Sequence, residues 1–284
     1  MSDIWTLHES AEEAANTYYT FKDGKPSLIP LGIKAIDDQI GGIGPGSPAI
    51  FGAGTGLGKS SVVLDACLWN QNINKVKPGY LSIEDTPDVV GCRLLARHSG
   101  IDSKKIRRKD LTTEELTSVR RAYDELKAVD PDTAMTIAYR VSRPLSDVVE
   151  GLVSLADAGC KIIYVDYIQK IRGVHDDRRN EIDRVFGTLH AEAYRKSVGL
   201  VFVSQISRQI DTDKIPQVTA LKESGGLETE ARIVLMLGRT PEDGKDRLSG
   251  IVRKSTYGGE GLRCSWERGP CGLLYQVAQT EEEF

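Results

Sequence analysis

The sequence lacks any apolar run that approaches the ~20 residues of a membrane-spanning helix. Its N-terminal region also lacks the basic and then apolar pattern of a secretory signal, because acidic residues follow Met1 at Asp3, Glu9 and Glu12. These two absences predict a cytoplasmic protein that does not associate with a membrane.

Cysteine is scarce and irregularly spaced. There are five cysteines, an odd number, with no CxxC pair among them, and the four histidines lie far apart in the sequence. A disulfide framework uses paired cysteines, and a zinc site uses closely spaced Cys or His ligands. We therefore expect buried or idle thiols in a reducing compartment.

Positive charge is not in excess either, since the formal net charge is −4 at pH 7. This excludes the global basic field of a histone-like nucleic-acid binder, so that any DNA contact has to be local. What the chain does have is 284 residues of which 40% are hydrophobic. That is enough for one large domain, or two small ones, with an ordinary buried core.

Short apolar segments alternate with longer amphipathic ones from residue 29 onward. Segments that are apolar on both faces predict buried parallel strands at residues 48–51, 80–83, 135–139, 162–165, 200–204 and 233–237. Helices are predicted between them at residues 59–69, 89–99, 113–128, 145–158 and 180–196. This alternation is typical of an α/β fold in which helices flank a mostly parallel central sheet.

The two ends of the chain differ from this pattern. After Gly238, turn residues separate predicted strands at 250–257, 262–266 and 273–277, which indicates β-hairpins that complete the sheet. Residues 1–28 are predicted to be an appendage to a domain of residues 29–284. The appendage contains a short amphipathic helix from Ser10, as N-cap, to Tyr19. This helix either folds back on its own domain or docks on a neighbouring subunit.

A glycine-rich segment, named here the phosphate loop, joins the first predicted strand to a helix. It consists of Ala53, Gly54, Thr55, Gly56, Leu57, Gly58, Lys59 and Ser60. Three glycines let the backbone turn tightly with its N–H groups pointing inward, and the helix N-terminus adds partial positive charge. Lys59 would reach the β and γ phosphates of ATP, and the Ser60 hydroxyl would bind Mg²⁺. Ala53 replaces the first glycine of the usual pattern, and Ser61 completes the predicted nucleotide site.

Polar residues end three of the predicted strands. Asp166 follows an apolar strand in the Walker B arrangement, where it would hold Mg²⁺ through water. Glu84 is a candidate catalytic base that orients the attacking water, or else a surface acid beside Asp85. Gln205 is a candidate sensor of the γ-phosphate, or else an ordinary polar strand end. Together these residues predict ATP hydrolysis.

In this order the motifs resemble one family, the RecA-like motor domain of DnaB-type replicative hexameric DNA helicases. The most specific strings are Asp166-Tyr167-Ile168-Gln169 and Leu221-Lys222-Glu223-Ser224-Gly225, since most other P-loop ATPases lack them. The matching pieces also include residues 31–33, 40–42, 45–46, 81–84, 204–208 and 226–228. The similarity runs from about residue 29 to the C-terminus.

The resemblance implies a motor that hydrolyses ATP with Mg²⁺ and moves 5′ to 3′ along single-stranded DNA as a hexameric ring. It implies that Glu84 is the base and Gln205 the sensor. It also places Lys222, Glu223 and Gly225 on a channel-lining loop, with Arg208 as a further DNA contact. Six copies of such a loop around one pore would concentrate positive charge that the whole chain lacks.

We expect a protein without the N-terminal primase-binding domain of this family, in which the helix near Ser10 resembles the linker helix that docks on the adjacent subunit. A helicase loader or a primase is an expected partner. In the family, an arginine finger stands two residues after a lysine. The sequence keeps the lysine as Lys254 but has Thr256 in place of the arginine. Lys254, Arg253 or Arg263 could supply that charge, at some loss of transition-state stabilisation.

Three other functions remain open. A RecA- or RadA-like recombination or repair ATPase would share the sheet and the phosphate loop, although the string from Leu221 to Gly225 disfavours it. An ATP-binding DNA scaffold with weak hydrolysis would be consistent with Thr256. A small-molecule P-loop kinase is disfavoured because it has no role for residues 205–228.

Overall fold

The computed structural model describes residues 6–8, 10, 28–171, 178–206, 215–221, 225–239 and 246–277. These residues contain a nine-stranded sheet with the order β3-β2-β4-β5-β1-β6-β7-β8-β9. The first six strands along the chain are parallel: β1 (Pro48–Ala53), β2 (Pro78–Ser82), β3 (Thr136–Tyr139), β4 (Ile162–Asp166), β5 (Gly199–Gln205) and β6 (Ile233–Gly238). The last three are antiparallel: β7 (Arg247–Ser255), β8 (Arg263–Arg268) and β9 (Leu274–Val277).

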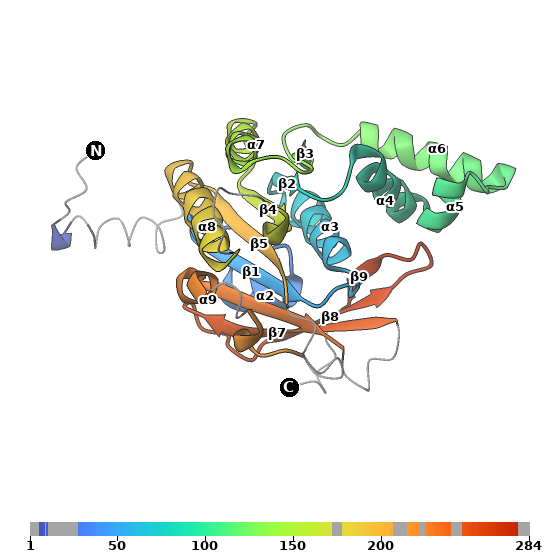
Figure 1. Ribbon diagram of the computed structural model, residues 1–284. Helices are drawn as coiled ribbons and strands as arrows, with labels where there is room; N and C mark the ends of the chain where they lie inside the picture. Colours follow the sequence, from blue (N-terminus) through green and yellow to red (C-terminus); the bar gives the residue numbers. More distant parts are fainter. Residues whose placement is uncertain are drawn as a thin grey trace.

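Helices lie on both faces of this sheet (Figure 1). The helices of the described residues are α2 (Lys34–Ile40), α3 (Lys59–Trp69), α4 (Pro87–Ser99), α5 (Ser103–Arg108), α6 (Thr113–Lys127), α7 (Leu145–Asp157), α8 (Arg178–Arg195) and α9 (Gly225–Glu230), of which α5 and α6 pack on α4. One core cluster packs α2 and α3 against one face, and a second packs α7 and α8 against the other. Within β1, Phe51 belongs to the first cluster and Ile50 to the second. The central strands are therefore buried on both faces, as a parallel sheet requires.

The predicted α/β class, the strands and the five long helices are confirmed, with ends that differ by a few residues. The antiparallel pairing of β7 with β8 and of β8 with β9 also confirms the expected hairpins. The sequence reading missed α2, α5 and α9, which have only seven, six and six residues. Helices this short show too little apolar periodicity to be recognised, and α5 buries no residue at all.

Some predictions fall on residues that the structure does not describe. Most of the predicted N-terminal helix, Ser10 to Tyr19, is among them. Elsewhere in the described ranges, no helix combines the length and the apolarity needed to cross a membrane.

Candidate nucleotide-binding site

The phosphate loop leaves the carboxyl end of β1 and enters α3. Gly56 and Gly58 have positive φ angles of 76° and 99°, and Gly58 is the N-cap of the helix. A Cβ atom at Gly58 would also lie 2.8 Å from Cδ1 of Leu274 on β9. The backbone conformation therefore favours glycine at this position, whereas a small shift of the end of the Leu274 side chain would relieve the contact.

The ammonium group of Lys59 turns back into the phosphate loop. Its Nζ donates to the carbonyl oxygen of Gly54 at 2.9 Å and lies 3.4 Å from that of Ala53. Burial lowers the pKa of Lys59, and the nearby carboxylates of Asp166 and Glu84 oppose this shift. A partly desolvated ammonium group that binds two loop carbonyls beside the N-terminus of α3 is suited to an anionic ligand.

Asp166 is fully inside the protein at the end of β4, and its two carboxylate oxygens have different surroundings. Oδ2 accepts a hydrogen bond of 2.7 Å from the hydroxyl of Tyr80 on β2, whereas Oδ1 has no hydrogen-bond partner among the described residues. Burial raises the pKa of Asp166, while the hydroxyls of Tyr80 and Ser60 oppose this. A buried carboxylate oxygen without a partner, close to a serine hydroxyl, is a donor set that fits hydrated Mg²⁺.

Gln205 ends β5, directly beside the phosphate loop. Its Nε2 donates to the hydroxyl of Thr55 at 2.7 Å. The amide of Gln169 holds the same residue by its backbone, accepting from the N–H of Gln205 at 3.0 Å and donating to its carbonyl at 3.0 Å. In the sequence, Gln169 stands out only as part of Asp166-Tyr167-Ile168-Gln169, and no sequence pattern predicts its contact with Gln205.

Glu84 follows β2 and is about half exposed, with Oε1 lying 3.6 Å from Nζ of Lys170. Its neighbour Asp85 is instead paired with Arg93 of α4. Lys59 and Lys170 both lie within 6 Å of the Tyr167 ring centroid, at 5.9 and 5.8 Å. Glu84 therefore stands on the same side of the sheet as the phosphate loop, although its role as a base stays a prediction.

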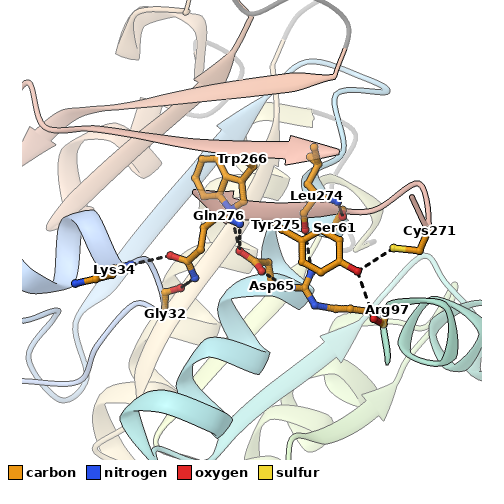
Figure 2. Close-up of polar contacts among 10 residues, drawn as sticks. All are labelled: Gly32, Lys34, Ser61, Asp65, Arg97, Trp266, Cys271, Leu274, Tyr275 and Gln276. Atoms are coloured by element: carbon orange, nitrogen blue, oxygen red, sulfur yellow. Dashed lines mark hydrogen bonds and ion pairs between the residues drawn. The ribbon is translucent and has the colours of Figure 1, made fainter. Parts of the chain in front are cut away.

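The hairpin of β8 and β9 holds the first half of α3 in place (Figure 2). The backbone N–H of Leu274 donates to the Ser61 hydroxyl at 2.7 Å, one residue after the predicted Mg²⁺ ligand. Asp65, one turn further on, accepts from Nε1 of Trp266 at 3.0 Å and from the N–H of Gln276 at 3.1 Å. It also pairs with Arg97 of α4.

The Asp65 cluster was missed by the sequence reading, although an acidic residue in the middle of an apolar helix was a visible signal. Burial raises the pKa of Asp65, and the charge of Arg97 opposes this. Arg97 also donates to the carbonyl of Leu274 at 2.8 Å and lies 4.0 Å from the Tyr275 ring centroid. The helix that presents Lys59 and Ser60 is thus anchored to the end of the sheet by ionic, polar and aromatic contacts.

The candidate trans-acting cations on β7 contact their own chain. Nζ of Lys254 donates to the carbonyls of Glu228 and Thr229, at 2.6 and 2.9 Å, near the C-terminal end of α9. Arg253 donates to the carbonyls of residues 215 and 216, at 2.9 and 3.2 Å. Of the predicted DNA-binding residues, Gly225 begins α9, whereas Lys222, Glu223 and Arg208 lie outside the described residues.

Comparison with known proteins shows which family the chain matches. The family model of the DnaB-like helicase C-terminal domain matches residues 29–261. The chain is 27% identical over 245 residues to a probable plasmid replicative DNA helicase of Chlamydia trachomatis, covering 84% of this chain and 53% of the relative. It is 28% identical over 231 residues to the replicative DNA helicase DnaB of Rickettsia bellii, covering 74% and 45%. The chain therefore spans about half the length of these relatives.

Solved structures agree with the fold. One structure, described as an ATPase domain, superposes with a TM-score of 0.81 at 21% identity, covering 97% of this chain and 100% of that one. A DnaB-like replicative helicase, solved in a study of its interactions with primase, superposes with a TM-score of 0.79 at 21% identity, covering 98% of this chain and 68% of that one. The sheet order and the added antiparallel strands thus form a known RecA-like architecture.

Proposed function

The chain belongs to the family of DnaB-like helicase C-terminal domains, and from this premise we propose that it is the ATP-hydrolysing motor of a replicative DNA helicase. The observation that carries the proposal is the convergence of Lys59, Asp166 and Gln205 at one loop. Asp166 ends β4, Gln205 ends β5, and Lys59 follows β1. These three strands are neighbours in the sheet. Open α/β sheets bind their ligands at the carboxyl ends of such strands.

The roles of the nucleotide-site residues follow from their positions. The backbone N–H groups of residues 54–60 would bind the phosphates, with Ser61 beside them, and Lys59 would exchange its contact with Gly54 for the β and γ phosphates. Ser60 would bind Mg²⁺, and Oδ1 of Asp166, which has no hydrogen-bond partner among the described residues, would hold it through water; when bound, the metal neutralises charge that develops on the phosphates. Glu84 would orient and deprotonate the attacking water.

Gln205 would couple this chemistry to DNA. Its side chain contacts Thr55 of the phosphate loop, and the chain continues from it towards the predicted DNA contact Arg208. We place Lys222, Glu223 and Gly225 on the loop that grips single-stranded DNA. α9 begins at Gly225, and Lys254 caps its far end, so that a shift of β7 would be passed to this loop.

The proposed assembly is a cytoplasmic hexameric ring, in which residues 1–28 dock on the adjacent subunit and residues 29–284 form the motor. A helicase loader or a primase is a proposed partner. Lys254, Arg253 or Arg263 would act on the neighbouring nucleotide in place of an arginine finger.

One observation favours a second candidate, an ATP-binding scaffold with weak hydrolysis. Thr256 stands where the family has its arginine, and Lys254 and Arg253 are both engaged with carbonyls of their own chain. In this candidate the nucleotide controls assembly on DNA, and slow hydrolysis resets it.

Displacement of a labelled strand from a forked duplex separates the two candidates. The motor predicts ATP-dependent displacement that requires a 5′ single-stranded tail and that is lost in Lys59→Ala. Binding of the fork without any displacement, in a preparation that forms rings, would refute the motor and favour the scaffold.

A further inference from the structure

We propose that Tyr80 is a positioning residue for the metal site: its hydroxyl holds Oδ2 of Asp166 so that Oδ1 stays available to hydrated Mg²⁺. This inference rests on the proposed function, because it concerns the metal that accompanies ATP. It assigns a purpose to a buried hydroxyl that the sequence motifs do not include.

The position of Tyr80 in the sheet explains the contact. β2 and β4 are parallel neighbours, with Ser82 opposite Asp166 and Tyr80 opposite Tyr164. Residues two apart on a strand share a face, so Tyr80 lies on the same face as Ser82 and Asp166, one step further into the sheet. From there its side chain reaches the carboxylate, and the hydroxyl donates to Oδ2 at 2.7 Å.

The two oxygens of Asp166 are thereby made different. A carboxylate can turn about its Cβ–Cγ bond, and a buried one turns to whatever donors are near it. Here Oδ2 accepts a hydrogen bond of 2.7 Å from the Tyr80 hydroxyl, whereas Oδ1 has no hydrogen-bond partner among the described residues, although the Ser60 hydroxyl is near enough to lower the pKa of Asp166. Partners behind a metal-binding carboxylate orient it in this way and are costly to remove.

Packing alone does not require the hydroxyl. The Tyr80 side chain is fully buried in the core cluster that also contains Phe51 and Val203. Phenylalanine would fill almost the same volume without the cost of burying a hydroxyl. The polar atom therefore serves Asp166.

Tyr164 offers a matched control. It is also fully buried and is the register partner of Tyr80, but its hydroxyl donates to the Leu31 carbonyl at 2.7 Å and accepts from Asn70 at 2.9 Å. Tyr164→Phe thus removes a buried tyrosine hydroxyl from the same sheet face without touching Asp166.

The experiment measures nucleotide binding by the full chain rather than turnover. A fluorescent ATP analogue is titrated at increasing Mg²⁺, and again in chelator, for wild type, Tyr80→Phe and Tyr164→Phe. We expect Tyr80→Phe to raise the half-saturating Mg²⁺ concentration about tenfold, as for one lost hydrogen bond to a charged group, with Tyr164→Phe within about twofold of wild type. Metal-free affinity stays the same in all three. Equal Mg²⁺ dependence of the two variants overturns the inference.

A second pair of variants tests orientation directly. In Asp166→Asn, the Tyr80 hydroxyl would bind the amide oxygen and turn the NH₂ group towards the metal, which abolishes the Mg²⁺ dependence of binding. Adding Tyr80→Phe to Asp166→Asn frees the amide to rotate, and we expect Mg²⁺ dependence to return in part. A double variant that binds no better than Asp166→Asn alone contradicts the orienting role.

These outcomes are distinct from failure of the proposed function. Wild-type protein with no Mg²⁺-dependent nucleotide binding overturns both claims. Normal wild-type binding, together with identical behaviour of Tyr80→Phe and Tyr164→Phe, overturns the role of Tyr80 alone.

Discussion

The side-chain amide of Gln205 donates to the hydroxyl of Thr55 at 2.7 Å, which joins the end of β5 to the phosphate loop across 150 residues of sequence. Gln169 fixes the backbone of Gln205 through two hydrogen bonds of 3.0 Å. The side chain of Gln205 is thus the movable part of an otherwise fixed residue. A nucleotide in the loop would offer it a phosphate oxygen as an alternative to Thr55.

This relationship predicts different effects from its two partners. We expect Gln205→Ala to lower ATP turnover about tenfold or more, with little change in affinity for Mg²⁺-ATP, because the lost contact forms with the γ-phosphate. Thr55→Val removes the same hydrogen bond from the loop side and should leave turnover within about threefold of wild type. Steady-state kinetics measure both. Equal losses of ATP turnover in the two variants would mean that the hydrogen bond between Gln205 and Thr55 matters in itself and that Gln205 does not sense the γ-phosphate.

Glu84→Gln tests the proposed base. The amide keeps the shape of the side chain but cannot take a proton from water, so hydrolysis should fall by about a hundredfold or more while ATP stays bound. Single-turnover hydrolysis and nucleotide binding are measured together. Asp85→Asn is the comparison, because Asp85 is the adjacent acid and is paired with Arg93. Turnover that survives in Glu84→Gln would place the base elsewhere.

Arg97→Ala should destabilise the protein strongly. Its side chain is 14% exposed and that of Asp65 only 3%, so the substitution leaves a buried carboxylate without its cation and also removes the contact with Tyr275. We expect a loss of about 3 kcal/mol in the free energy of unfolding, measured by denaturant titration.

Arg121→Ala on α6 is the control for Arg97. Arg121 pairs with Glu125 at 3.9 Å on the surface, with the two side chains 72% and 55% exposed. Such exposed ion pairs contribute little to stability, so the free energy of unfolding should change by no more than about 0.5 kcal/mol. A similar small loss in Arg97→Ala would show that the cluster beside α3 does not anchor it.

Asp37 predicts how stability depends on pH. Its carboxylate accepts from the backbone N–H groups of Leu31 and Ile33, and burial raises its pKa from 3.8 to about 7. Between these values the folded state binds a proton that the unfolded state has released. The contribution of Asp37 to stability is therefore full below pH 3.8 and is lost as the pH rises towards 7.

The test compares thermal unfolding of wild type and Asp37→Asn from pH 5 to pH 8. Wild type should lose stability relative to the variant as the pH rises through this window, because asparagine carries no titrating proton. A constant difference between the two proteins across the window would contradict the raised pKa of Asp37.

The local parts of the site could be predicted from sequence, and the long-range parts could not. Glycines followed by Lys59 and Ser60 encode a strand-to-helix turn within eight residues, and Asp166 is marked by the apolar strand before it. In contrast, the contact of Tyr80 with Asp166 spans 86 residues, and that of Asp65 with Gln276 spans 211. Such contacts depend on strand order and register, which hydrophobic patterns do not determine.

The order β3-β2-β4-β5-β1 brings these distant residues together. It places β2 beside β4, and therefore Tyr80 near Asp166, although several helices and a strand separate them in the sequence. Lys254 also makes a contact that no sequence pattern indicates. The sequence makes it a candidate to replace the arginine finger towards a neighbouring subunit, and within its own chain its ammonium group caps the C-terminal end of α9.

Calorimetric titration of the purified protein with Mg²⁺-ATP measures directly whether residues 53–61 bind a nucleoside triphosphate. We expect saturable binding at the loop in wild type, and its loss in Lys59→Ala at an unchanged melting temperature. Heat of binding that is the same in Lys59→Ala, or absent from well-folded wild type, would contradict this expectation.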